Sequence, residues 1–158
     1  MNAQTMEFID RMGLALESDG LPRIAGRIFG LLLLSEDCRS LDDLADALGV
    51  SKGSVSTNAR LLEQRGVLER NCRPADRRDY YRVPPDLFSQ TMAQRLARWQ
   101  RFHEAIGEAR TSLPIRSRKV LQRLEEYQAA YAFMSDVIHE GLTRWQDEHR
   151  PAVAGLRR

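Results

Sequence analysis

The chain has 158 residues, of which 42% are hydrophobic and 29% are charged. These values fit one compact domain, with or without a helical arm, and exclude a disordered chain. The formal net charge is only +2, yet residues 51–83 carry eight basic and four acidic side chains. A local basic patch on a nearly neutral protein favours contact with phosphate groups.

Two helices are predicted at the start of the chain, over residues 4–18 and 23–34. The first has apolar residues at a helical period and ends at Asp19-Gly20, and Pro22 then opens the second. Residues 23–34 are apolar on nearly every side, so they should form the buried central helix. The longest apolar run, residues 29–34, is too short to cross a bilayer, and no secretory signal precedes it. We therefore expect a cytoplasmic protein without a membrane partner.

Two short helices with clear start and stop signals follow. Ser40 is a candidate N-cap with Asp43 three residues later in a capping-box arrangement, and Gly49 suits the left-handed end of that helix. Ser51 then caps a helix that runs to about residue 65 and ends at Gly66. Two capped helices separated by a glycine-containing turn predict a helix-turn-helix.

A β-hairpin is predicted directly after the second helix of this pair. Residues 67–70 and 80–83 have the character of short strands, and the polar, charged residues 74–79 between them suit a turn. A hairpin in this place is the wing of a winged helix-turn-helix. We therefore predict a DNA-binding region over residues 1–83, in which helix 4–18 packs at a dimer interface.

The second half of the chain is predicted to be helical. Pro84-Pro85 opens a long helix with one narrow apolar stripe, and Pro114 separates it from a last helix over residues 117–148. In that last helix apolar residues recur every seven positions, which indicates pairing along its length. We predict a dimerisation region over residues 84–150 and a flexible tail over residues 151–158. The predicted dimerisation residues are Leu124, Tyr127, Tyr131, Met134, Ile138 and Trp145. The fold class is therefore mainly α, with a small β-hairpin wing and long C-terminal dimerisation helices.

The helix after Ser51 has two distinct faces. Val55, Ala59 and Leu62 lie together on a helical wheel and should face the domain, which leaves a polar face opposite them. Small hydroxyl side chains near a helix N-terminus let the backbone approach phosphate, and longer side chains can reach base edges in the major groove. An ordinary solvated face is the alternative, and a wing tip that carries two arginines favours DNA. The candidate DNA-binding residues are Ser51, Lys52, Gly53, Ser54, Ser56, Thr57, Asn58, Arg60 and Gln64 on the helix, and Arg77 and Arg78 on the wing.

Three stretches of this region resemble the MarR superfamily of transcriptional regulators. They are SKGSVSTN at residues 51–58, RGVL at residues 65–68, and DRRDYY at residues 76–81. Within the superfamily the chain is most similar to the GbsR branch. The resemblance covers about residues 5–110 and implies a homodimeric winged-helix repressor that binds a palindromic operator and responds to a small molecule. It also implies that Asp76 orients Arg78 towards DNA.

Other function classes have less support. No nucleotide-binding or nucleophile-elbow motif is present and the histidines are scattered, so we expect no enzyme, no metal and no cofactor. Two alternatives stay open. One is a redox-sensing regulator that uses Cys38 or Cys72, each of which stands beside an arginine. The other is a winged helix that serves protein contacts and has no operator.

Aromatic residues of the second half could bind an effector. The GbsR resemblance points to choline or glycine betaine, whose cationic quaternary ammonium group an aromatic cage can hold. The candidate effector residues are Trp99, Phe102, Tyr127 and Tyr131, although core packing explains their spacing as well. The expected partners are double-stranded DNA with an inverted-repeat operator, a second copy of the chain, and a small-molecule effector.

Overall fold

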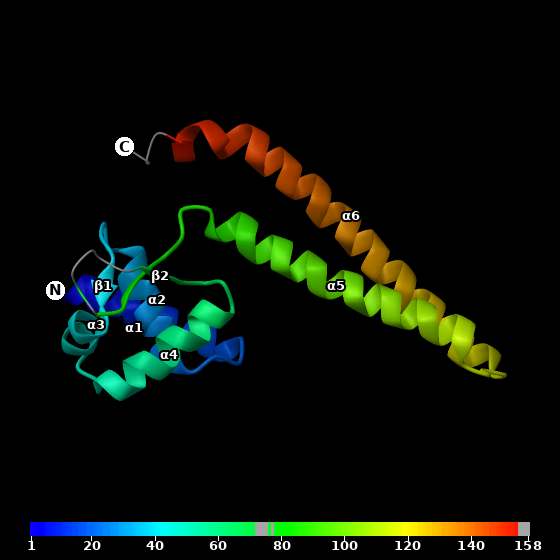
Figure 1. The fold of residues 1–158 in the computed structure, drawn as a ribbon, viewed down its shortest axis with the longest axis horizontal. Helices are drawn as coiled ribbons and strands as arrows, with labels where there is room; N and C mark the ends of the chain where they lie inside the picture. Colours follow the sequence, from blue (N-terminus) through cyan, green and yellow to red (C-terminus); the bar gives the residue numbers. More distant parts are fainter. Residues whose placement is uncertain (72–75, 77, 155–158) are drawn as a thin grey trace. The chain divides into compact units, whose positions relative to one another are not determined.

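The computed structural model describes residues 1–71, 76 and 78–154, with side chains up to Glu148. The chain divides into two compact units, Met1–Leu87 and Phe88–Arg158. The described part of the first unit holds short helices and a small sheet, and that of the second holds two long helices (Figure 1). None of the helices in the described ranges combines the length and the apolar composition that crossing a bilayer needs.

The helices of the first unit follow the predicted order. Helix α1 covers Ala3–Ser18 and α2 covers Arg23–Leu33, so both agree with the predicted ranges to within one residue. Helices α3, Leu41–Leu48, and α4, Lys52–Gln64, form the predicted helix-turn-helix. The predicted fold class is confirmed: a mainly helical winged-helix chain with a small antiparallel sheet.

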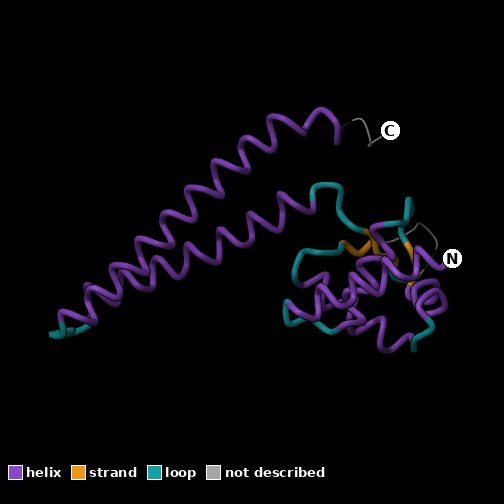
Figure 2. Tube along the Cα trace, turned by 180° about the vertical axis from the view of Figure 1, so that it is seen from behind, coloured by secondary structure: helices purple, strands orange, loops and turns teal. Residues whose placement is uncertain are grey.

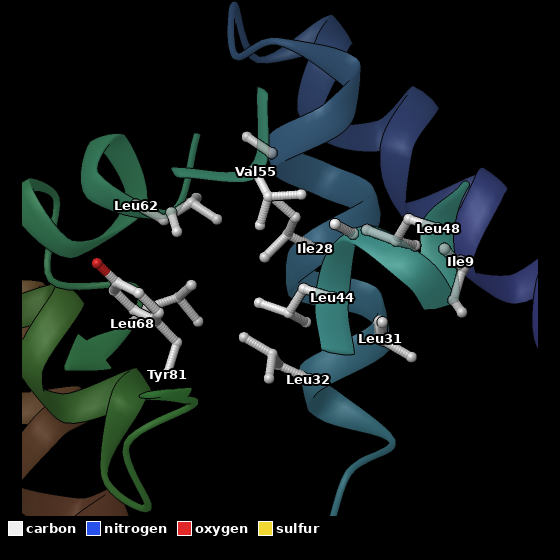
Figure 3. Close-up of a cluster of buried hydrophobic side chains, with 13 residues drawn as sticks. Ile9, Ile28, Leu31, Leu32, Leu44, Leu48, Val55, Leu62, Leu68 and Tyr81 are labelled. Atoms are coloured by element: carbon white, nitrogen blue, oxygen red, sulfur yellow. The ribbon is translucent and has the colours of Figure 1, made fainter. Parts of the chain in front are cut away.

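One hydrophobic cluster holds these helices and the sheet together (Figure 3). Ile28, Leu31 and Leu32 of α2 are buried, as predicted for the central helix, and side chains of the other elements surround them. The cluster also contains Ile9, Leu44, Leu48, Val55, Leu62, Leu68 and Tyr81. Burying one side chain of this size contributes roughly 1.5–3 kcal/mol. The cluster therefore fixes the rotation of α4 about its own axis.

Three short strands form one antiparallel sheet, seen as the orange segments of Figure 2. They are β1, Arg39–Ser40, β2, Glu69–Asn71, and β3, Tyr80–Arg82, in the order β1-β3-β2. The predicted hairpin is the β2-β3 pair, but β2 begins two residues later than predicted. The reason is that the N–H groups of Val67 and Leu68 donate to the Leu62 carbonyl, at 2.9 and 3.4 Å, and so close the end of α4. The sequence does not predict β1, because two residues are too short for an alternating pattern.

Helices α1 and α2 pack at very short range through glycine. A Cβ built on Gly26 would lie 2.4 Å from the Met12 carbonyl oxygen, and one built on Gly30 would lie 3.0 Å from the Met12 Cβ. Arg27 pairs with Asp10 across the same two helices, with 2.9 Å between Nε and Oδ1. Position 26 therefore requires glycine for the two helices to approach.

The second unit consists of two antiparallel helices that run side by side (Figure 1; Figure 2). Helix α5 covers Leu87–Ser112 and α6 covers Arg118–Ala154. The helix continues beyond residue 151, where the sequence predicts the start of a tail. Proline has a backbone φ close to that of a helix and removes one hydrogen bond, so the backbone can continue through Pro151. Residues 155–158 of the predicted tail lie outside the described part.

The heptad stripe of α6 packs against α5 of the same chain. Leu124, Tyr131 and Ile138 are half-buried. The Tyr131 ring stacks on Phe102 with 5.5 Å between centroids, and the Trp145 ring lies 5.0 Å from that of Phe88. The sequence predicts this stripe as a dimer interface, and a seven-residue repeat is the same whether the partner helix belongs to the same chain or to another. These residues are therefore occupied within the chain.

Five further large apolar side chains of α6 are exposed beside the heptad stripe. They are Val120, Tyr127, Phe133, Met134 and Val137, which we name the outer stripe. Tyr127 is 57% exposed, Phe133 65% and Met134 39%. No described side chain of the second unit is fully buried. One copy of this helical pair therefore leaves much of its apolar surface in water.

Candidate nucleic-acid interface

Side-chain caps hold the helix-turn-helix in shape. Ser40 Oγ accepts a hydrogen bond from the Asp43 N–H at 3.1 Å, and Asp43 Oδ2 accepts one from the Ser40 N–H at 3.0 Å, which confirms the predicted capping box. Gly49 ends α3 with a φ of 65°, a left-handed conformation that glycine adopts without strain. Ser51 Oγ then accepts from the Ser54 N–H at 3.2 Å. These bonds fix both helix starts and the turn between them.

Helix α4 presents a polar face on the side opposite the core. Val55, Ala59 and Leu62 are fully buried, as predicted. The exposed members of the predicted set are Ser51, Lys52, Gly53, Thr57, Arg60 and Gln64, and Ser54 and Ser56 are half-buried. A Cβ built on Gly53 meets no atom within 4 Å, so the helix surface is open at this point.

Asn58 does not belong to this face. Its side chain is buried, and its Nδ2 donates to the Ser54 carbonyl at 2.8 Å. The neighbouring Ala59 and Val55 face the core, so Asn58 stands at the edge of the buried side. Its amide stabilises the first turns of α4, and we leave it out of the candidate interface.

Several cations of the basic segment are paired with acids. Lys52 Nζ lies 2.8 Å from Asp42 Oδ1, and Arg70 lies 3.4 Å from Asp79 and 3.8 Å from Glu63. Arg82 pairs with Glu69. Arg60, by contrast, forms no ion pair with any residue in the described ranges. Arg60 is exposed on the polar face of α4.

The wing carries a tightly hydrogen-bonded ion pair between Asp76 and Arg78. Arg78 donates to the Asp76 carboxylate from its backbone N–H at 3.0 Å, from Nε at 3.0 Å and from Nη2 at 2.7 Å. The Tyr80 hydroxyl donates to the same carboxylate at 2.7 Å. These bonds hold the pKa of Asp76 far below its usual range and raise that of Arg78. Even so, 55% of the Arg78 side chain is exposed.

The sequence predicts roles for Asp76 and Arg78 but none for Tyr80. The only signal for Tyr80 is its place in the DRRDYY stretch, which does not show the direction of a side chain. Arg77, the other predicted wing residue, lies outside the described residues.

The charge of Arg78 also lowers the pKa of Asp43, although hydrogen bonds from Ser40 are the main cause of that shift. The contribution of Arg78 to this shift is a minor one.

Three of the four predicted effector residues lie together between α5 and α6. Tyr131 is in ring contact with Phe102 at 5.5 Å and with Trp99 at 6.4 Å, whereas Tyr127 lies on the outer stripe. The ring planes of Phe102 and Tyr131 are only 8° apart and stacked. Because the two faces are in contact, these rings do not enclose a cation between them.

Of the two cysteines of the alternative redox site, the structure describes Cys38. Cys38 is half-buried just before β1 and forms no disulfide, and Cys72 lies outside the described residues. Within residues 1–71, 76 and 78–148, no three His, Cys, Asp or Glu side chains are grouped as metal ligands would be.

Comparisons with known proteins agree with this geometry. Residues 19–79 match the model of the MarR family. The chain is 38% identical over 148 residues to the HTH-type transcriptional regulator MmpR5 of Mycobacterium tuberculosis, over 89% of this chain and 86% of that protein. It is 25% identical over 147 residues to the putative HTH-type transcriptional regulator YvaV of Bacillus subtilis, over 83% of each. A solved structure described as a transcriptional regulator matches with a TM-score of 0.81 and 34% identity, over 91% of this chain and 99% of that one.

Proposed function

Because this chain belongs to the MarR family of winged-helix, DNA-binding transcriptional regulators, we propose that it is a homodimeric repressor of a palindromic operator. The observation that carries the proposal is the polar face of α4, followed in the chain by a wing with an exposed, braced arginine. The resemblance of residues 51–58 supports the finer assignment to the GbsR branch. The relatives are regulators, and we propose no catalytic activity for this chain.

The residues of the polar face divide by what they can reach. Gly53 and Thr57 leave the backbone of α4 close to the helix surface, so this part of the helix suits close approach to DNA. Arg60 is unpaired within the described residues and long enough to reach a base edge in the major groove. Arg78 lies on the wing, where arginines contact minor-groove edges and phosphates. We propose that α4 reads the sequence and that Arg78 contributes affinity for any sequence.

The outer stripe supports a homodimer. A strip of this kind is rarely left in water by a stable protein, and a second copy carries an identical strip. Helix α1 also exposes Phe8 and Leu14, which supports the predicted share of α1 in the interface. Two identical recognition helices require an inverted repeat, with half-site centres about 10 bp apart.

The proposal includes a small-molecule effector. A shallow groove of about 410 Å³ lies between α5 and α6, lined by Leu96, Ala97, Gln100, Ser135, Asp136 and His139. The Asp136 carboxylate gives this groove a charge that suits a cation. A thermal-shift screen of choline, glycine betaine and aromatic acids tests it, and Asp136→Asn should abolish any shift that a cation produces.

Selection of random duplexes by the purified protein tests the proposed function. The expected result is an enriched inverted repeat, bound by two chains. A reporter gene placed behind that repeat should then lose expression when the protein is supplied. No enriched motif would contradict the operator and favour a winged helix that serves protein contacts. A single half-site bound by one chain would contradict the dimer.

A further inference from the structure

Tyr80 contacts both members of the wing ion pair. Its hydroxyl donates to Asp76 Oδ2 at 2.7 Å, and the Arg78 guanidinium lies over its ring, 5.4 Å from Cζ to the centroid. The Asp76 carboxylate is thus held by the tyrosine as well as by the arginine. The bonds from Arg78 to this carboxylate use its backbone N–H, Nε and Nη2, and none of them uses Nη1.

Tyr80 is itself fixed by the sheet. Its side chain is only 3% exposed, and it lies in the middle strand β3, where it pairs with Ser40 of β1 and with Asn71 of β2. Ser40 is also the N-cap of α3. The same residue therefore joins the start of the helix-turn-helix, through its backbone, to the Asp76–Arg78 pair, through its side chain.

We propose that Tyr80 is a positioning residue for the wing arginine, which holds Asp76 and through it fixes Arg78 relative to the helix-turn-helix. This inference rests on the proposed function, because it concerns how Arg78 meets DNA. An arginine that is already held in one geometry loses less side-chain freedom when it binds phosphate or a groove edge. The geometry leaves the Nη1 edge of the guanidinium for that contact.

Tyr80→Phe tests the role of the hydroxyl and keeps the buried ring. The matched control is Tyr81→Phe, which removes the same group from the next position of β3, where the side chain enters the core. Affinity is measured on the selected operator and on a random duplex over a series of salt concentrations. Tyr80→Phe should weaken both complexes about three- to tenfold and flatten the salt dependence. Tyr81→Phe should change neither.

A double-mutant cycle separates positioning from a general structural role. In an Arg78→Ala background, Tyr80→Phe should cost no further affinity, because the proposed effect of the tyrosine on DNA binding passes through the arginine. An equal loss in both backgrounds, or no loss in either, would overturn the proposal. An Arg78→Ala variant that binds DNA with wild-type affinity would also overturn the proposal. That result would leave the proposed binding of the operator by α4 unaffected. Failure of the wild-type protein to select any motif would instead contradict the proposed function itself.

Discussion

Ser40 and Asp43 cap helix α3 by exchanging two hydrogen bonds, each from the backbone N–H of one residue to the side-chain oxygen of the other. The same Ser40 pairs with Tyr80 in the sheet. The cap therefore stands where the helix-turn-helix meets the wing.

Asp43→Asn should destabilise the first unit in a pH-dependent way. At pH 7 we expect a loss of about 1 kcal/mol in the free energy of unfolding, as for other N-terminal caps. The pKa of Asp43 is lowered in the fold, chiefly by hydrogen bonds from Ser40. Its contribution is therefore complete above the unfolded-state pKa of 3.8 and is lost as the pH falls through the lower folded value. Denaturant unfolding of wild type and variant should show a gap that narrows below about pH 4. An equal gap at pH 7 and pH 3 would contradict this origin.

Gly53→Ala should separate stability from DNA binding. The added methyl group meets no atom within 4 Å, so it causes no clash in the free protein. Replacing glycine within a helix raises stability by up to about 0.5–1 kcal/mol. Because Gly53 lies on the proposed DNA-facing side, affinity for the operator should fall at the same time. Thermal unfolding and a binding titration measure the two effects, and unchanged operator affinity would remove Gly53 from the interface.

Arg60→Ala should cost about 1–3 kcal/mol of binding free energy on the operator and little on random DNA, as expected for a side chain that reads a base edge. The matched control is Arg65→Ala. Arg65 is also exposed and basic, but it is the C-cap residue of α4, one position beyond the helix. Equal losses on both kinds of DNA for Arg60→Ala would make it a phosphate contact.

Arg78→Ala should weaken binding to all sequences alike. The proposed contact is to phosphate or a groove edge, so the slope of log affinity against log salt should flatten by about one unit. Titrations at several salt concentrations measure that slope. A loss confined to the operator would assign Arg78 to base reading instead.

Met134→Asp should dissociate the dimer and leave the helical pair intact. Met134 lies on the outer stripe, whereas Tyr131 packs against Phe102 within the chain. Tyr131→Asp should therefore lower the helical content as well, because it removes a contact between α5 and α6. Gln122→Asp, at an exposed polar position of α6, is the control for the added charge. Sedimentation measures the oligomeric state, and circular dichroism measures the helical content. A Met134→Asp variant that is still a dimer at micromolar concentration would contradict the proposed interface.

Local signals account for what the sequence predicts well. The Ser40–Asp43 cap and the left-handed turn at Gly49 depend on residues a few positions apart, so the helix-turn-helix could be located closely. The buried side of α4 follows from helical periodicity in the same way. Asn58 shows the limit of helical periodicity. It lies at the border between the buried and the polar side of α4, and a helical wheel does not decide to which side such a residue belongs.

Contacts between distant residues account for what the sequence misses. Strand β1 exists only because β3 pairs with it, and two residues carry no pattern of their own. The heptad stripe of α6 predicts a partner helix but does not say which one. The role of Tyr80 depends on the fold of a turn that brings its hydroxyl to Asp76.

The glycine contact between α1 and α2 ties the N-terminal helix rigidly to the rest of the first unit. Gly26 leaves no room for even a methyl group against Met12, so α1 cannot slide along α2 without losing that fit. Helix α2 is in turn packed into the same cluster as α3 and α4. A displacement of α1 relative to α3 and α4 would therefore require the contact between Gly26 and Met12, or the shared cluster, to be broken.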